Sequence, residues 1–147
     1  MRLIPNSRLI PVLLLVGSAA ALPGSAAVAD DLSGTQRLLC TAVQATVCTE
    51  DGDCVVDLPW NVNVPQFIEV DLVGKKLATT KASGENRATP IEFVRRQEGV
   101  IVLQGFERGR AFSLVISEET GMLSAAVATD GRTVAVFGAC TPMPAVR

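Results

Sequence analysis

The chain has 147 residues, with 13 basic and 15 acidic side chains and with neither histidine nor tyrosine. A chain of this length is expected to form one domain whose core needs neither a metal nor a partner. The absence of histidine excludes Ser-His-Asp and Cys-His catalysis, and an acidic chain without a basic stripe argues against nucleic acid as a partner.

The N-terminal segment has the order of a secretory signal peptide. Residues 1–8 are basic, residues 9–22 are apolar, and a triplet of small, variable and small residues ends at Ala29. The apolar run is shorter than the ~20 residues that a membrane span needs. We expect residues 1–29 to be removed and residues 30–147 to form a single β domain, exported to the periplasm rather than the extracellular space. The segment takes two arginines with it, so 11 basic and 15 acidic side chains remain, a net charge of −4.

Four cysteines, Cys40, Cys48, Cys54 and Cys140, are typical of two disulfides in a small exported domain. A zinc site would need closer pairs and usually histidine, so we expect no metal and no cofactor. Three pairings are open. The polar turn at 49–53 favours Cys48 with Cys54, which leaves Cys40 with Cys140.

The remainder of the chain alternates short β-branched runs with turn residues, which is typical of an antiparallel meander. The strongest hairpin signal is Asp130-Gly131. The expected strands are 54–58, 67–73, 77–80, 88–95, 100–106, 110–117, 122–129 and 132–138. These eight short strands predict an all-β fold, a barrel rather than a sandwich, with an N-terminal segment tethered by a disulfide.

Residues 38–48 are ambiguous between strand and helix. The segment is rich in β-branched residues, but Ser33 or Thr35 could cap a helix that includes it. Turns in a plain meander alternate between the two ends of the sheet, which places Cys54 and Cys140 at one end. A strand at 38–48 would put Cys40 at the other end. The expected Cys40–Cys140 disulfide therefore favours a helix or loop across the barrel mouth.

Several expected strands are apolar on both faces, including residues 100–103, 114–116 and 134–137. A sheet with one solvated face should alternate, so these strands are expected to be covered on both sides. The N-terminal segment or a second sheet could cover them. Alternatively, one face accepts a partner subunit or an apolar ligand.

The loop between Pro59 and Pro65 holds Trp60, the only tryptophan, beside Asn61 and Asn63. An aromatic ring next to two amides is a candidate binding edge for a ligand or partner. The alternative is that Trp60 folds back as a lid on the core.

Turn positions predict a cluster of charges at one end of the barrel. Arg108 and Arg110 are our candidates for binding an anionic ligand, and charged turns that promote solubility are the alternative. The basic members are Lys81, Arg87, Arg108, Arg110 and Arg132, mixed with Glu85, Glu107 and Asp130.

A few motifs resemble those of small exported proteobacterial proteins of uncharacterised function. They are the run 104–107, Ile116-Ser117 and the closing Phe137-Gly138-Ala139-Cys140-Thr141, which carries an F-G-x-C motif, together with the three upstream cysteines. The resemblance spans most of the chain after residue 29. It implies export, disulfides and an all-β fold, and it implies no activity, ligand or catalytic residue.

These observations favour a non-enzymatic envelope protein, a binding or inhibitor-like module that engages a small ligand or a protein. The alternative is a structural component that forms a homodimer through its apolar strands. Least favoured is a hydrolase that uses Glu69 and Asp71, which lie ~7 Å apart on one face of a strand. No segment after residue 29 is long and apolar enough to span a membrane.

Overall fold

The computed structural model describes residues 31–143, and this part of the chain is an all-β protein with 61% of its residues in strands. The strands are β1 (Arg37–Thr49), β2 (Cys54–Asp57), β3 (Phe67–Asp71), β4 (Lys76–Thr79), β5 (Ala88–Pro90), β6 (Phe93–Gln97), β7 (Val100–Glu107), β8 (Arg110–Ser117), β9 (Met122–Thr129) and β10 (Arg132–Pro142), with 3₁₀ turns η1 (Pro59–Val62) and η2 (Lys81–Ser83). The expected signal peptide, residues 1–29, lies outside the described residues, so its removal stays a prediction.

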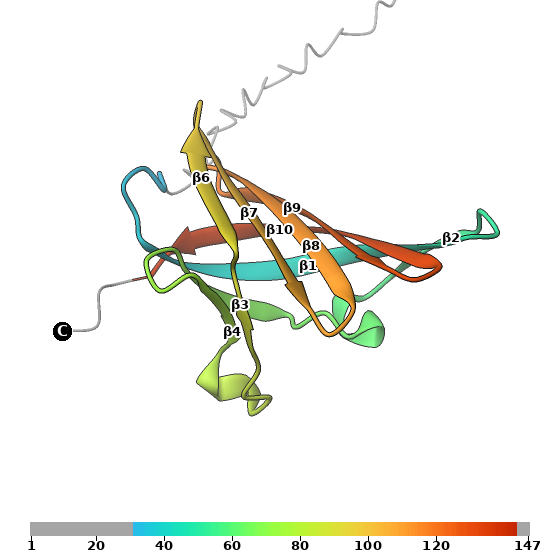
Figure 1. The fold of residues 1–147 in the computed structure, drawn as a ribbon. Helices are drawn as coiled ribbons and strands as arrows, with labels where there is room; N and C mark the ends of the chain where they lie inside the picture. Colours follow the sequence, from blue (N-terminus) through green and yellow to red (C-terminus); the bar gives the residue numbers. More distant parts are fainter. Residues whose placement is uncertain (1–30, 144–147) are drawn as a thin grey trace, which may run out of the picture.

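All strands of the described chain belong to one antiparallel sheet, in the order β5-β4-β3-β1-β10-β9-β8-β7-β6, with β2 paired to β1 beside this path. The sheet curls into a half-barrel (Figure 1). The predicted fold class, all-β and barrel-like with disulfides, is confirmed.

The helix or loop that we favoured at 38–48 is wrong, because these residues belong to β1. The N-terminal half of β1 pairs with β3 and its C-terminal half pairs with β2. Both partners are antiparallel to β1, so β2 and β3 run in the same direction along one edge. The expected helix at 38–48 depended on a reversal of direction between these two strands. Without that reversal, Cys40 and Cys140 lie at the same end of the sheet although both are on strands.

The single strand expected at 88–95 is divided into β5 and β6, which lie at opposite ends of the sheet order. The division occurs at two consecutive residues whose backbone N–H groups point to different strands. The N–H of Ile91 donates to the carbonyl of Lys75 at 2.9 Å, and the N–H of Glu92 donates to that of Gln104, also at 2.9 Å. Because the two edge strands are contiguous in the chain, this bend links the margins of the half-barrel.

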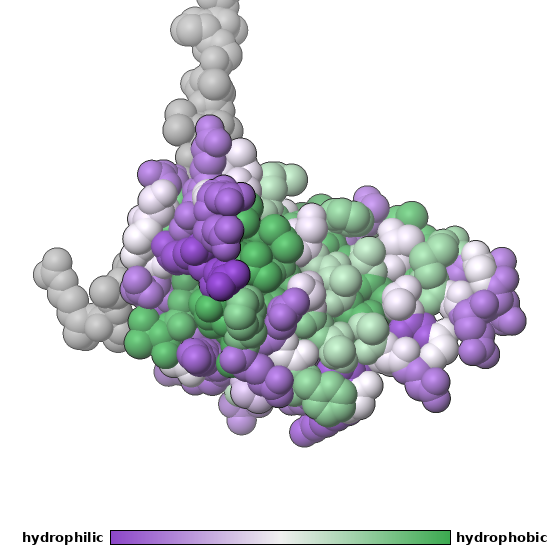
Figure 2. Space-filling model, turned by 45° about the horizontal axis from the view of Figure 1, so that its top comes forward, coloured by the Kyte–Doolittle hydropathy of each residue, from purple (hydrophilic) through white to green (hydrophobic). Residues whose placement is uncertain are grey.

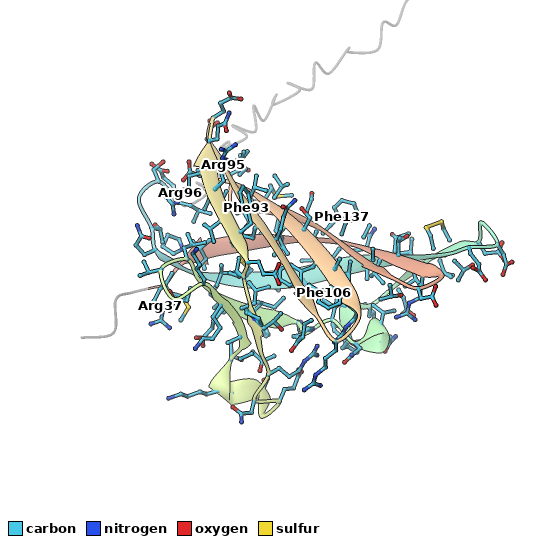
Figure 3. All side chains as sticks on the ribbon, viewed as in Figure 1. Arg37, Phe93, Arg95, Arg96, Phe106 and Phe137 are labelled. Atoms are coloured by element: carbon cyan, nitrogen blue, oxygen red, sulfur yellow. A yellow bond between two sulfur atoms is a disulfide. The ribbon has the colours of Figure 1, made fainter. Side chains whose placement is uncertain are left out.

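The core occupies the inner face of the sheet, where alternate residues of each strand are buried. One end is closed by Leu32, which is 0% exposed and whose N–H donates to the carbonyl of Glu118 at 2.8 Å. Arg96 holds this segment from outside, since it forms an ion pair with Glu118 at 2.9 Å and donates to the carbonyl of Thr35 (Figure 3). The main buried cluster is Leu32, Leu38, Cys40, Val70, Leu72, Ile91, Ile101, Leu103, Leu114, Ile116, Leu123 and Cys140.

The two disulfides join cross-strand partners. Cys40 faces Cys140 between β1 and β10, and Cys48 faces Cys54 across the β1–β2 hairpin. The favoured pairing is confirmed, and both bonds are typical of an oxidising, exported environment. Within residues 31–143 we find no helix with the length and hydrophobicity of a membrane span.

The expectation that the doubly apolar strands are covered on both faces is wrong for the described residues. Inward-facing Ile101 and Ile116 are 0% exposed, whereas outward-facing Val115 and Phe137 are 42% and 45% exposed. All ten strands are in one sheet, so no second layer of the described chain lies over the outer face.

Candidate functional site

The interior of the half-barrel is not filled at the end opposite Leu32, which leaves an open cavity of about 140 Å³ that we call the cup. Its apolar lining comes from the inward faces of β1, β3, β4, β8, β9 and β10 and from the loop after η1. These residues are Ala42, Val62, Val64, Pro65, Ile68, Leu77, Phe112, Leu114, Leu123, Ala125, Val127, Val134 and Val136. The polar lining consists of Asn63, Arg87, Thr89, Glu107, Arg110, Thr129 and Arg132.

The polar lining collects at the cup's mouth because several of its members flank hairpin turns. Glu107 and Arg110 are the last and first paired residues around the β7–β8 turn, and Thr129 and Arg132 flank the β9–β10 turn in the same way. Inward-facing positions deeper along these strands are apolar. The result is an apolar floor beneath a charged mouth.

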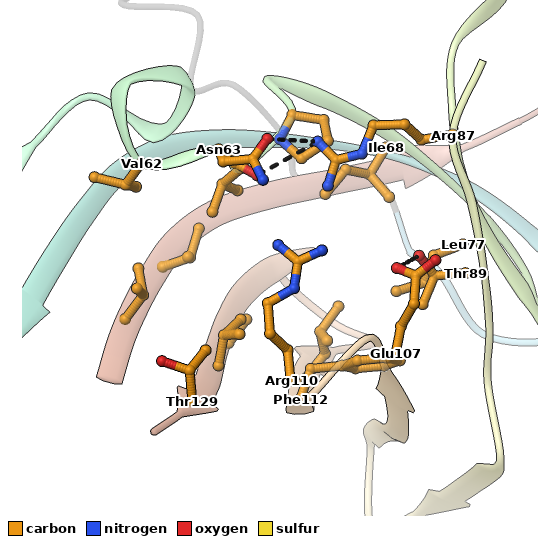
Figure 4. A pocket seen from close by; sticks show the side chains of 18 of the residues that line it. Val62, Asn63, Ile68, Leu77, Arg87, Thr89, Glu107, Arg110, Phe112 and Thr129 are labelled. Carbon is orange, nitrogen blue, oxygen red and sulfur yellow. Dashed lines mark hydrogen bonds between the residues drawn. The ribbon is translucent and has the colours of Figure 1, made fainter. Parts of the chain in front are cut away.

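Arg87 approaches the mouth from the opposite wall and ties two loops together. Its Nη1 donates to the backbone carbonyl and the side-chain Oδ1 of Asn63, at 3.4 and 3.3 Å, and lies 3.5 Å from a carboxylate oxygen of Glu85 (Figure 4). The loop after η1 is thereby held beside the cup. Val62, the last residue of η1, and Val64 of this loop pack against the core.

Arg110 is the basic group at the mouth that is best placed to meet a ligand. Figure 4 shows its side chain rising into the space between the two walls. Its guanidinium makes no hydrogen bond or ion pair with any of residues 31–143, although Glu107 is its cross-strand partner. Glu107 instead accepts a hydrogen bond of 2.7 Å from the hydroxyl of Thr89. The mouth is lined by three arginines and Glu107, and because Arg87 is paired with Glu85, one net positive charge remains there.

The structure brings together two of the five residues that the sequence singled out as binding candidates. Asn63 and Arg110 both line the cup. Trp60 does not: it is 51% exposed and borders a separate depression of about 360 Å³, so it is not a lid on the core either. Arg108 lies in the β7–β8 turn and is exposed.

Asn61 has a local role instead. Its amide donates to Asp57 Oδ1 at 2.8 Å, and the Leu58 N–H donates to the same oxygen at 2.7 Å. The Asn61 hydrogen bond, followed by that of Leu58, lowers the pKa of Asp57 below its ordinary value of 3.8.

The polar site residues that were not selected as binding candidates from the sequence are Arg87, Thr89, Glu107, Thr129 and Arg132. Turn positions had predicted that the charged residues of this set lie at one end of the barrel. That prediction was correct for Arg87, Arg110 and Arg132, which line the same cavity. Lys81 was grouped with them but lies in η2, outside the cup lining.

Glu69 and Asp71, the carboxylates of the hydrolase hypothesis, do not line the cup. Glu69 lies 3.4 Å from Arg37 across β1 and β3, and Asp71 accepts a hydrogen bond of 2.7 Å from the N–H of Gly74 at the β3–β4 turn. Each therefore has a structural partner.

Comparisons of the chain with models of protein families, with curated proteins and with solved structures found no match.

Proposed function

We propose that this protein is a non-enzymatic binding protein of the cell envelope that holds a small organic anion in the cup. The single observation that supports this most is the guanidinium of Arg110, which stands without a partner in residues 31–143 above an apolar floor. A binding site for an amphipathic anion needs a cationic group at its mouth and an apolar floor beneath it.

The size of the cup determines the class of ligand. An engineered apolar cavity of about 150 Å³ holds benzene, so the cup at about 140 Å³ holds one aromatic ring or a short alkyl group. An adjoining hollow of about 90 Å³, lined by Leu77, Ala78 and Thr79 among others, adds room for a small substituent. We therefore propose a small aromatic or short-chain carboxylate as the ligand.

The charges at the mouth fit a carboxylate in particular. A guanidinium offers parallel N–H donors that match the two oxygens of a carboxylate. Arg110 supplies this fork, and Arg132 at the same end adds attraction over a longer range. Glu107 accepts a hydrogen bond from Thr89 and forms no ion pair with Arg110, so the Arg110 guanidinium stays free to meet a carboxylate.

We also propose that the protein acts in the periplasm after removal of residues 1–29. Both disulfides and the composition of the N-terminal segment support this. Expression of the whole chain followed by fractionation and N-terminal sequencing tests it. The expected result is a periplasmic product that begins at Asp30, and a product that retains residue 1 in the cytoplasm would contradict it.

Binding is tested by NMR titration of the purified domain with benzoate and with neutral benzamide. Benzoate should shift methyl signals of Leu114, Val127 and Val134, and should bind about 10-fold more tightly than benzamide, because a hydrogen bond to a charged group contributes ~1.5–3 kcal/mol. Equal affinities, or shifts confined to other parts of the sheet, would reject the proposal.

The matched variants are Arg110→Gln and Arg108→Gln, which remove the same charge two residues apart. Arg110 lines the cup and Arg108 does not. The first substitution should weaken benzoate binding about 10-fold and leave benzamide binding unchanged. The second should change benzoate affinity less than twofold. Equal effects of the two variants would show that only net charge matters.

A further inference from the structure

The outer face of β8, β9 and β10 carries no charged side chain. These strands contain two charged residues, Arg110 and Arg132, and both line the cup on the inner face. We call the outward-facing residues of the three strands the uncharged face. They are Ala111, Ser113, Val115 and Ser117 of β8, Met122, Ser124, Ala126 and Ala128 of β9, and Thr133, Ala135, Phe137, Ala139 and Thr141 of β10.

This composition differs from that of a solvated sheet face, which is normally polar and charged. Val115, Met122 and Phe137 are 42%, 60% and 45% exposed, and Phe106 of β7 extends the apolar area at 54%. Figure 2 shows a broad area of hydrophobic and neutral residues between hydrophilic groups at the two ends of the molecule. An apolar area of this kind marks an interaction surface.

The uncharged face has relief that is complementary to itself. Cross-strand pairing aligns Val115, Ser124 and Phe137 in one row, which is a ridge because of its large members. The next row along the strands is Ser113, Ala126 and Ala135, and the one after it contains Ala111, Ala128 and Thr133. All of these small residues except Ala135 line an open hollow beside Phe106, and Glu92 lies at its far edge, outside the uncharged face.

We propose that two copies of this chain associate back to back through the uncharged face. A twofold axis at the centre of the Ala126–Ala135 pair places Phe137 of each copy over Ala128 of the other, so that each ridge enters the hollow opposite. An isologous interface requires a surface that is complementary to itself, because the same patch supplies both halves of the contact. Small residues at the axis allow the two sheets to approach closely.

Charge and area also favour a second copy as the occupant. Burying a face without charges desolvates no ion if the opposing surface also carries no charge. The uncharged face of a second copy is such a surface. The three strands of the uncharged face, at ~4.8 Å spacing and eight residues in length, cover ~390 Å² on each copy. The outward residues of the neighbouring strands β7 and β1, such as Val102, Phe106 and Thr46, extend the contact to ~650 Å². Two such faces bury ~1,300 Å², which is within the range of stable interfaces. The cups lie on the opposite side of each sheet and stay open, so the dimer does not depend on the ligand.

Analytical ultracentrifugation of the purified domain between about 1 and 100 μM tests the proposal, with Phe137→Glu and Phe67→Glu as matched variants. The two rings are similarly exposed, at 45% and 42%, but Phe67 lies on β3 outside the uncharged face. The wild-type protein should sediment at twice the mass of the chain. Phe137→Glu should raise the dimer dissociation constant at least 100-fold, and Phe67→Glu should change it less than threefold.

Two further measurements keep the result interpretable. Far-UV circular dichroism should be the same for both variants, and Ala126→Glu, which brings two like charges together at the axis, should dissociate the dimer independently. Methyl signals of Val115, Ala126 and Ala135 should have the same positions in the wild type and in Phe67→Glu, which both dimerise, and different positions in Phe137→Glu. A monomer at 100 μM, or a dimer that Phe137→Glu and Ala126→Glu leave intact, would overturn the proposal. So would a monomer that binds vesicles of phosphatidylglycerol and phosphatidylethanolamine through this face.

Discussion

Cys40 and Cys140 face each other across β1 and β10, and the disulfide between them joins residues 100 positions apart in the sequence. Both belong to the buried core, at 1% and 7% exposure. The first and last strands of the domain are thus bonded at the centre of the sheet, beside the core. The second disulfide, between Cys48 and Cys54, spans six positions at an exposed hairpin.

The two disulfides should differ in their effect on stability. Loop-closure entropy gives ~4.7 kcal/mol for a loop of this larger size and ~2 kcal/mol for the smaller one. The pair Cys40→Ala/Cys140→Ala should therefore lower the free energy of unfolding by about twice as much as Cys48→Ala/Cys54→Ala in urea titrations. If the first pair fails to fold, stepwise reduction by dithiothreitol should break Cys48–Cys54 first. Equal losses, or earlier reduction of Cys40–Cys140, would contradict the prediction.

Gly138 should not tolerate a side chain. It lies opposite Ala42, next to the irregularity in register between Ala42 and Gln44, and a Cβ there would collide with the backbone carbonyl of Thr41. Gly138→Ala should cost ~2–3 kcal/mol or more, because the neighbouring backbone must move. Ala139→Ser, which also adds one heavy atom but at an exposed position, should cost less than ~0.5 kcal/mol. Thermal and urea unfolding measure both, and similar losses would refute the explanation.

Leu32 should be essential to stability although it lies only two residues after Asp30. Its side chain is 0% exposed and closes one end of the half-barrel. Leu32→Ala should lower the free energy of unfolding by ~2–5 kcal/mol, as for other buried leucines. Ser33→Ala, at the exposed neighbouring position, is the control and should be nearly neutral. A loss below ~1 kcal/mol for Leu32→Ala would mean that this end of the core can close without it.

The carboxyl group of Asp57 should titrate below 3.8, chiefly because the Asn61 amide donates to its charged form. Since the pKa is lowered by folding, any stabilisation from this group is complete above its ordinary pKa and is lost as the pH falls through its value in the folded protein. Carbon-detected NMR titration should show the pKa of Asp57 rising toward 3.8 in Asn61→Ala. Asn63→Ala, which touches Arg87 instead, should leave it unchanged.

Local patterns were sufficient for much of the fold. Strands β8 and β9 have the bounds that alternation and turn residues predicted, and the Asp130-Gly131 turn joins β9 to β10 as expected. The polar turn at 49–53 was likewise enough to pair Cys48 with Cys54. Each of these features depends on residues a few positions apart in the sequence, and strand and turn propensities act over that range.

The candidate site was only partly predictable. Turn positions correctly grouped Arg87, Arg110 and Arg132 at one end, because every second turn of an antiparallel meander lies at the same end. Trp60 and Asn61 were selected for their chemistry, yet Trp60 points away from the cup and Asn61 caps Asp57. Which polar side chains face inward depends on how the loop after η1 packs, and composition does not contain that information.

The sequence by itself determined the all-β class, the positions of most strands and the turns, and it favoured the Cys48–Cys54 pairing, because alternation and turn chemistry are local or nearly local properties. The tertiary structure alone decided three things: that β1 is a strand shared by β2, β3 and β10, that one run of residues is divided between the two edges of the sheet, and that the outer face is uncovered within residues 31–143. All three depend on which edges pair between strands far apart in the chain. Such pairing is governed by the closure and twist of the whole sheet, and a period-2 pattern is equally compatible with several partners.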